Sequence, residues 1–237
     1  VNYDYNNKYL LTVSGRWDGA SQLAEGNKWA FFPSAALGWR LDQEEFLKDV
    51  TWLNQLKFRL GVGVTGNSAI DPYQTKGAIV SLYYPFGSAL APGYAASEPL
   101  IKDGAVAMAN KNLSWEKTTQ YNIGLDYSVL NGRISGVLDF YTSRTTDLLM
   151  AMTIPSLNGY TNTYANVGKT SNIGVDITLN TVNVKTRDFE WSTSINAAWQ
   201  KDKIDELANG KEDDINNNWF IGQALGVIYG YECGGLW

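Results

Sequence analysis

Hydrophobic residues recur at every second position through long stretches of the chain, which is the pattern of a β-strand with one apolar face. In the stretch 53–65, for example, Phe58, Leu60 and Val62 alternate with polar residues. The same period predicts seven strands, at 3–17, 29–41, 53–65, 115–129, 133–147, 167–182 and 189–203. The Asn-Gly pair at 131–132 is a strong hairpin signal, so we expect an all-β fold of antiparallel, up-and-down strands.

A short motif occurs twice, as NIGLDYSVL at 122–130 and as NIGVDITLN at 172–180. In each copy Asn, Gly and Asp fall on one face, whereas Ile, Leu, Val and Tyr fall on the other. We expect the two copies to lie in the same sheet and to run in the same direction, with one strand between them. Glycine on the polar face would leave room for its neighbours, and Asp126 and Asp176 would point away from the apolar side.

The predicted connections alternate between long and short. The long ones are 18–28, 66–114, 148–166 and 204–227, and the shorter ones are 42–51, 130–132 and 183–188. In an up-and-down sheet this alternation places all long loops at one end and all short links at the other. That asymmetry is typical of outer-membrane barrels, which have short periplasmic turns and longer extracellular loops.

Tryptophans flank the apolar face of the predicted strands. Trp29 and Trp39 share a face and are about 33 Å apart along the strand, or about 23 Å in height at a tilt near 45°. This height matches the apolar band, about 25 Å tall, between the two aromatic girdles of a membrane barrel. Trp191 and Trp199 repeat the arrangement. We therefore expect seven apolar side chains to face lipid: Phe58, Leu60, Val62, Leu125, Leu138, Ile177 and Ile195.

The opposite face of the same strands carries charges that a dry protein core accepts only when they are paired. On a barrel these side chains would be lumen-facing: Arg40, Lys57, Arg59, Asp126, Asp139 and Asp176. A soluble β-sandwich or a small ligand-binding barrel shows the same alternation with its apolar face turned inward. The length of the strands favours the membrane barrel over this alternative.

Composition removes several functional classes. The 237 residues include 19 basic and 24 acidic side chains spread along the chain, which argues against a nucleic-acid partner. The chain has no histidine and one cysteine, so Ser-His-Asp, Cys-His and zinc chemistry are excluded within it. No apolar run approaches the roughly 20 residues of a membrane-spanning helix. We expect no enzyme activity and no cofactor.

Aromatic residues cluster in the long loop 67–113 among Gly, Pro and Ala. On an extracellular loop they would stack on sugar rings or contact a lidding partner. The alternative is that they pack the loop against itself. The candidates for substrate or lid contact on the long loops are Tyr73, Tyr83, Tyr84, Phe86, Tyr94, Tyr160 and Trp219.

Two groups of polar residues fit known chemistry poorly. Asp214, Asn216 and Asn218 have the alternating oxygen spacing of a calcium loop, but the glycine and the final glutamate of that loop are missing. A solvated polar loop is the preferred interpretation, with a calcium site as the alternative. Asp139 and Asp147 lie on one predicted strand about 26 Å apart, far beyond the roughly 5–10 Å that glycosidases require.

Several longer segments are similar to a known family. They are KYLLTVSGRWDGAS, FFPSAALGWRL, LKFRLGVGVTGN, NLSWEKTTQYNIGLDYSVLNGRISGVLDFYTSRTTDLL, NVGKTSNIGVDITLN and the closing IGQALGVIYGYECGGLW. In order and spacing they resemble the C-terminal barrel of SusC/RagA-type TonB-dependent transporters. The resemblance covers nearly the whole chain, with departures at Ala20 and Ala224, where serine and proline are common.

The resemblance implies a much larger protein, with a signal peptide, a TonB box, a plug domain and a barrel of about 22 strands. Residues 1–237 would then form part of the barrel domain, without the plug, TonB box or signal peptide. It also implies import of oligosaccharides, other glycans or peptides across the outer membrane of a Gram-negative bacterium. The implied partners are a SusD-like lipoprotein, the TonB-ExbB-ExbD system and outer-membrane lipid. A soluble, lectin-like carbohydrate-binding module is the alternative.

Overall fold

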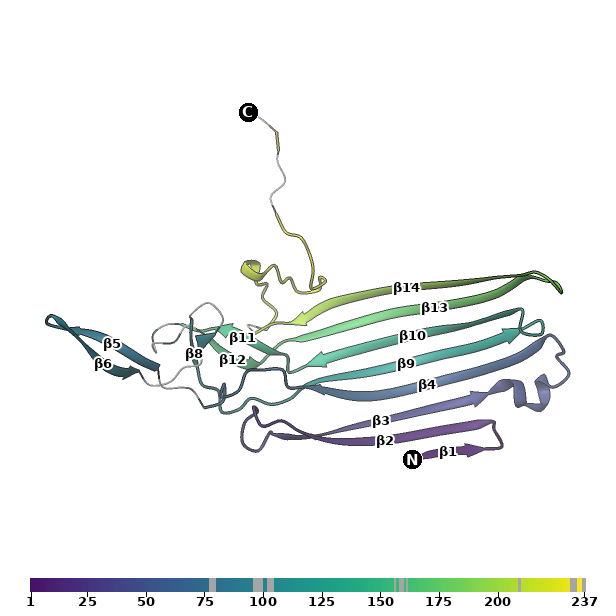
Figure 1. The fold of residues 1–237 in the computed structure, drawn as a ribbon, viewed down its shortest axis with the longest axis horizontal. Coiled ribbons are helices and arrows are strands. Elements are labelled where there is room, and N and C mark those ends of the chain that lie inside the picture. Colours follow the sequence, from purple (N-terminus) through teal and green to yellow (C-terminus); the bar gives the residue numbers. More distant parts are fainter. Residues whose placement is uncertain are drawn as a thin grey trace.

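The computed structural model contains a long antiparallel sheet with a group of shorter strands at one end (Figure 1). The structure describes residues 1–237 except 77–79, 96–99, 102–104, 156, 158–159, 161, 209, 231–233 and 236–237. The side chains that it describes also exclude those of 80–84, 92–95, 100–101 and 105–107. Among the described residues, no helix has the length and apolar character needed to cross a membrane.

Eight strands form the main sheet, in the order β1-β2-β3-β4-β9-β10-β13-β14. All neighbouring pairs are antiparallel, so the chain runs up and down through the sheet. The strands are β1 Asn2–Tyr5, β2 Tyr9–Gly19, β3 Trp29–Arg40, β4 Leu53–Asn67, β9 Glu116–Val129, β10 Ile134–Thr146, β13 Lys169–Lys185 and β14 Glu190–Glu206. The predicted up-and-down, all-β architecture is confirmed. The sheet is open, with β1 and β14 at its edges.

The prediction of one strand over 3–17 is wrong, because this stretch forms a hairpin of β1 and β2. Asn6 and Asn7 lie between the two strands with φ of 54° and 58°, and the Asn7 N–H donates to Asp4 Oδ1 at 2.7 Å. Asparagine enters the left-handed region more readily than most residues, which makes an Asn-Asn pair a turn signal. The alternating tyrosines on both sides concealed it. The other six predicted strands are confirmed, with each end within three residues of its predicted position.

The connections at one end of the sheet are short, and we call this the short-turn end. Two 3₁₀ turns, η1 Leu41–Gln43 and η2 Glu45–Leu47, join β3 to β4. Residues 130–132 all have positive φ and join β9 to β10. Figure 1 shows these links at one end of the sheet and the long connections at the other, the long-loop end. The predicted alternation of long and short connections is therefore confirmed.

The long connections contain six short strands that the sequence pattern did not predict. They are β5 Val80–Phe86, β6 Ala89–Ala95, β7 Leu100–Ile101, β8 Ala105–Met108, β11 Leu149–Thr153 and β12 Asn162–Asn166. The strands β5 and β6 form a separate hairpin, and the other four form a small sheet. These segments are short, and β6, with the sequence ALAPGYA, is rich in Ala, Gly and Pro, so they lack a clear period of two.

The main cluster of buried apolar side chains lies at the long-loop end. It contains Ala20, Leu23, Phe32, Leu113 and Trp115. The rings of Phe32 and Trp115 meet edge to face at 5.3 Å, and the Trp115 indole N–H donates to the Lys28 carbonyl at 3.2 Å. This cluster holds the β2–β3 loop against the start of β9. Many large apolar residues of the long strands are instead exposed, so the sheet does not enclose a core of its own.

Candidate functional site

The cross-strand pairing gives the main sheet one apolar face and one polar face. Leu60 of β4 pairs with Ile123 of β9, which pairs with Phe140 of β10 and through it with Val175 of β13. These residues define the apolar face. The seven side chains predicted to share a lipid-facing side all lie on it: Phe58, Leu60, Val62, Leu125, Leu138, Ile177 and Ile195. The predicted registration is therefore confirmed, and contact with lipid remains a prediction.

Aromatic residues mark both edges of the apolar face. On β3, Trp29 lies at the long-loop end and is 64% exposed, and Trp39 lies near the short-turn end. On β14, Trp199 and Trp191 take the corresponding places, 58% and 56% exposed. Large exposed aromatic rings at two separate levels are the arrangement found at the two interfaces of a membrane barrel.

The aromatic edge at the long-loop end runs diagonally across the sheet, nearer to the long loops on β3 than on β14. One row of neighbouring residues crosses the apolar face through Ala35, Val62, Tyr121, Thr142, Ile173 and Lys201. Trp29 lies six residues above this row on β3, towards the long loops, whereas Trp199 lies two residues below it on β14. From Trp29 to Trp199 the edge shifts by about 27 Å along the strand direction while it crosses about 24 Å of sheet. The strands would thus be tilted by roughly 45° to a membrane normal, close to the tilt of transmembrane barrels.

The polar face is organised around Arg59 of β4. Its Nε donates to Asp126 Oδ1 on β9 at 2.9 Å, and its Nη2 donates to both carboxylate oxygens of Asp139 on β10, at 3.0 and 3.1 Å. The side chain reaches β10 by passing over Gly124 of β9, where an added Cβ would lie only 2.6 Å from Arg59 Cζ. Glycine is therefore required at this position, because any side chain would occupy the path of the guanidinium group.

The second copy of the motif uses its glycine in the same way. Tyr141 of β10 passes over Gly174 of β13, where an added Cβ would collide with the ring and lie 2.7 Å from its Cε1 atom. The Tyr141 hydroxyl donates to Gln200 Oε1 on β14 at 3.4 Å. In both copies, a long side chain from the preceding strand crosses the glycine to reach the following strand. Asp126 and Asp176 both lie on the polar face, and β10 separates the two copies. The expectations for the repeated motif are confirmed.

The remaining residues predicted to line the lumen also lie on the polar face. Arg40 pairs with Asp42 at 2.8 Å, next to Lys57 in the register. Asp176 is exposed and stands directly opposite Asp139, whose charge is partly balanced by Arg59. The six predicted residues therefore share one side of the sheet. That this side lines a lumen remains a prediction.

A hydrogen-bonded group that the sequence analysis missed lies at the short-turn end. The Glu44 carboxylate, between η1 and η2, accepts hydrogen bonds from Lys8 Nζ at 2.9 Å, Tyr9 Oη at 2.8 Å and Trp39 Nε1 at 3.0 Å. These bonds, with Lys8 first, lower the pKa of Glu44 to about 2. The rings of Tyr9 and Trp39 thus lie on the apolar face, while the Tyr9 hydroxyl and the Trp39 indole N–H are hydrogen-bonded to Glu44 in the β3–β4 turn. Lys8 and Tyr9 are 36 and 35 residues away from Glu44 in the sequence, which concealed the group.

The aromatic candidates at the long-loop end lie in different settings. Phe86 is 82% exposed at the tip of the β5–β6 hairpin, and Tyr73 is 69% exposed. These two do not pack into their loop. Tyr83, Tyr84 and Tyr94 fall on β5 and β6, and their side chains lie outside the described ones. Tyr160 is half-buried. No contact with a substrate or lid is tested for any of them.

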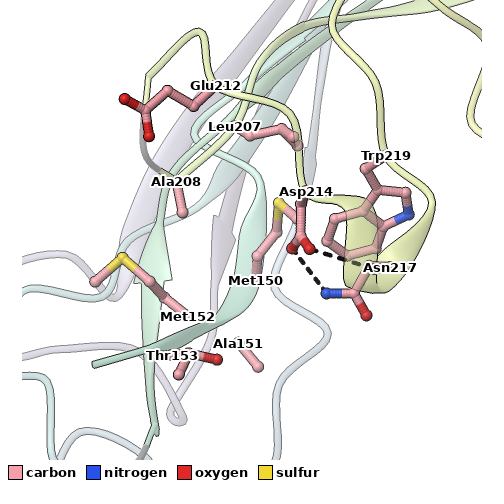
Figure 2. Close-up of a pocket in the computed structure, with 10 residues that line it drawn as sticks. All are labelled: Met150, Ala151, Met152, Thr153, Leu207, Ala208, Glu212, Asp214, Asn217 and Trp219. Carbon is pink, nitrogen blue, oxygen red and sulfur yellow. Dashed lines mark hydrogen bonds between the residues drawn. The ribbon is translucent and has the colours of Figure 1, made fainter. Parts of the chain in front are cut away.

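A small pocket of about 90 Å³ lies at the long-loop end between β11 and the segment that follows β14 (Figure 2). It is lined by Met150, Ala151, Met152, Thr153, Leu207, Ala208, Glu212, Asp214, Asn217 and Trp219. The methionines come from β11 and were not predicted. Among the described aromatic candidates, Trp219 lines this pocket, and Figure 2 shows it on the side away from Met152.

The predicted calcium alternative falls on the loop beside this pocket. The Asp214 carboxylate accepts hydrogen bonds from the Asn217 backbone N–H at 3.2 Å and from Asn217 Nδ2 at 2.8 Å, which caps the short turn Ile215–Asn217. Asn218 has a left-handed backbone with φ of 56°. Within the described part of the chain, no three His, Cys, Asp or Glu side chains are grouped to hold a metal ion. The Asp214 carboxylate is thus engaged in local capping, and the solvated polar loop and the calcium site both remain predictions.

Known proteins resemble this chain over most of its length. TonB-dependent receptor SusC of Bacteroides thetaiotaomicron is 40% identical over 224 residues, which cover 90% of this chain and 21% of SusC. TonB-dependent receptor P3 of Formosa agariphila is 34% identical over 248 residues, which cover 100% of this chain and 24% of that receptor. The chain thus spans about a quarter of the length of these relatives.

Solved structures show the same arrangement of strands. A chain of the RagAB peptide importer in the open-open state superposes with a TM-score of 0.81 at 29% identity, over 94% of this chain and 23% of the other. A second structure, of the RagAB peptide transporter, gives a TM-score of 0.79. The family model described as TonB dependent receptor-like, beta-barrel, matches residues 1–231. The chain therefore belongs to the TonB-dependent receptor β-barrel family.

Proposed function

We propose that this chain forms wall strands of an outer-membrane barrel that imports oligosaccharides, other glycans or peptides by a TonB-dependent mechanism. The observation that carries the proposal is the division of one sheet into two faces. The apolar face exposes large side chains between two aromatic edges, and the polar face carries the Arg59 ion pairs. Lipid on one side and a wet lumen on the other satisfy both faces.

The orientation follows from the connections. Bacterial barrels have short periplasmic turns and long extracellular loops. The short-turn end would thus face the periplasm, and the β5–β6 hairpin with the pocket beside Trp219 would lie outside the cell. Arg40, Lys57, Arg59, Asp126, Asp139 and Asp176 would then line the lumen. We assign no catalytic role and no cofactor to the chain.

The proposed partners follow from the relatives. One relative is named SusC, and the superposed structures are those of a RagAB peptide importer. For this protein we propose a SusD-like lipoprotein at the extracellular mouth and the TonB-ExbB-ExbD system as the energy source. A soluble, lectin-like module would need the apolar face to be enclosed. The exposure of that face and the membership of a barrel family both count against it.

Uptake by a triple loop variant tests this proposal. Replacing Tyr83, Tyr84 and Phe86 together by alanine in the whole gene product should weaken uptake of the glycan or peptide cargo and leave barrel assembly intact. The reason is that loop tips contribute little of the buried area of a fold. Phe46 and Trp52 supply a matched control, because they are exposed aromatic residues at the short-turn end.

The control variant, with alanine at both of those positions, should import normally. If the triple loop variant assembles and imports normally, these aromatic residues do not contribute to substrate contact. Failure of the wild-type protein to insert into the outer membrane would overturn the proposed function as a whole.

A further inference from the structure

Basic side chains stand on the apolar face at its long-loop end, just beyond the aromatic edge. The register places Arg144 beside Thr119 of β9 and Ser171 of β13, and Ser171 in turn pairs with Lys203. Counting by twos along each strand puts five basic residues on this face: Lys117, Arg144, Lys169, Lys201 and Lys203. Charged residues are costly on a lipid-facing surface unless they lie at the level of the head groups.

Three of these cations follow the same diagonal as the aromatic edge. Relative to the row through Tyr121, Lys117 lies four residues above on β9, Arg144 two residues above on β10, and Lys201 in the row on β14. If the strands are tilted by roughly 45°, the line from Trp29 to Trp199 runs parallel to the membrane surface. All three cations then lie on the long-loop side of this line and within about 5 Å of it. They therefore form one row, parallel to the proposed membrane surface.

The same three cations are the ones without a carboxylate partner. Lys203 pairs with Asp205 at 3.0 Å, and Lys169 pairs with Glu206 at 2.6 Å. Within the described part of the chain, no ion pair includes Lys117, Arg144 or Lys201. All three side chains are exposed. The carboxylates near Arg144, those of Asp205 and Glu206, are each paired with a lysine outside the row, so the row keeps a net positive charge.

The opposite edge of the apolar face is arranged differently. Two lysines next to the aromatic residues there are neutralised within the chain, Lys8 by Glu44 at 2.9 Å and Lys185 by Glu190 at 3.2 Å. Arg133 and Arg187, in two separate turns at that end, have no ion pair among the described residues, but they form no row across neighbouring strands. The row of three cations is therefore a feature of the long-loop side of the apolar face. A ligand that complements it must be anionic and must reach the sheet from the lipid side, at the outer surface of the membrane.

We propose that Lys117, Arg144 and Lys201 bind the phosphate groups of a glycolipid in the outer leaflet, with lipid A as the occupant. The planar guanidinium of Arg144 suits bidentate contact with phosphate, and the flexible lysines can extend to head groups on either side. Acyl chains would lie along Ile123, Phe140 and other residues of the apolar face. The inference rests on the proposed membrane function and adds a specific lipid contact to it.

Lipid binding to the purified whole gene product tests the inference. The probes are lipid A with both phosphates and the same lipid after removal of its phosphates, each titrated in detergent and followed by native mass spectrometry. Replacing Lys117, Arg144 and Lys201 together by glutamine should weaken binding of phosphorylated lipid A on the order of 100-fold, at about fivefold for each cation. The variant should also lose the preference for the phosphorylated form, and wild-type binding should weaken with added salt.

The matched control replaces two neighbouring ion pairs whole by neutral amides, Lys169→Gln with Glu206→Gln and Lys203→Gln with Asp205→Asn, so that the net charge near Arg144 is unchanged. It should retain the phosphate preference and bind within a few-fold of wild type. Equal binding of both lipid forms by the wild type, or an unchanged preference in the triple variant, would overturn the inference. A triple variant that changes its oligomeric state but binds lipid A normally would also overturn it, in favour of a protein neighbour. Each of these outcomes leaves the proposed import function standing if the protein inserts and transports.

Discussion

The two faces of the main sheet are built on the same backbone yet satisfy opposite demands. On β9, Ile123 is 49% exposed on the apolar face, while its neighbour Asn122 lies on the polar face and donates to Asp139 at 3.4 Å. Among the described residues, no side-chain hydrogen bond or ion pair joins neighbouring strands in the middle of the apolar face. The polar face is instead linked from strand to strand through Arg59 and Tyr141. Each of these strands is therefore specified twice, once by the exposed surface of its apolar face and once by the neighbours that it meets on its polar face.

A charge placed on the apolar face should have the largest effect. Ile123 lies midway between the aromatic edges, so Ile123→Arg should destabilise the inserted barrel by about 2–4 kcal/mol, the cost of a basic residue at the bilayer midplane. Asn122→Arg, one residue away on the polar face, is the matched control and should assemble normally. The measurement is the fraction of folded protein in the outer membrane, read from heat-modifiable migration on gels. Equal assembly of the two variants would show that the apolar face tolerates a charge as well as the polar face does, which contradicts the prediction.

A bulky residue at Gly124 should have an intermediate effect on the polar face. Gly124→Val would collide with Arg59 and Asp139 and separate them, at a cost of about 1–3 kcal/mol. Gly61→Val is the control, because the nearest atom to an added Cβ there is Asn122 Cβ at 3.9 Å. Denaturant unfolding of the purified barrel checks both variants. A Gly61 variant as unstable as the Gly124 variant would show that replacing any glycine of the strands by valine is destabilising, whether or not a side chain such as Arg59 crosses it.

The second copy of the motif sharpens this comparison. Gly174→Val should collide with Tyr141, and removing the ring with Tyr141→Ala should recover part of the loss. The double-mutant coupling is expected to be about 1 kcal/mol, as for side chains in direct contact. Additive effects of the two substitutions would contradict the role assigned to the glycine. The same unfolding measurement serves for all variants.

The sequence predicted the long strands well and the loop strands poorly, for a physical reason. A strand such as β13 has one apolar face and one polar face, so its sequence alternates with a period of two, as Ile173 on the apolar face and Asp176 on the polar face show. The β5–β6 hairpin lacks such a record, because its residues do not separate into an apolar and a polar face. The hairpin β1–β2 was missed because Tyr3, Tyr5 and Tyr9 keep their alternation through the turn.

The candidate site was predictable in part. The polar-face charges followed from their position opposite apolar residues, and the role of the glycines as open space was anticipated from the motif. The partners were not, since Arg59 meets Asp139 across an intervening strand and 80 residues of sequence. Glu44 was missed because its three donors converge only when the short turn folds beside β2.

The smallest expected effect concerns the Glu44 group, which ties the lower aromatic edge of the apolar face to the turn. Its pKa is lowered from 4.5 to about 2, so the carboxylate interactions are fully present above about pH 4.5 and are lost as the pH falls towards 2. A ¹³C-glutamate NMR titration should show this resonance titrating well below the other glutamates, and Glu44→Gln should remove it. A midpoint near 4.5 would show that Lys8, Tyr9 and Trp39 do not hold the carboxylate.

Spin-label accessibility along β9, measured in the inserted whole protein, would show directly whether its two faces meet lipid and lumen. Labels placed singly at 120–123, 125 and 126 should alternate, with Tyr121, Ile123 and Leu125 accessible to oxygen dissolved in lipid. Gln120, Asn122 and Asp126 should instead be accessible to a water-soluble nickel reagent or be shielded by protein within the lumen. Accessibility of the apolar positions to the nickel reagent, or their immobilisation in a packed protein interior, would contradict the account.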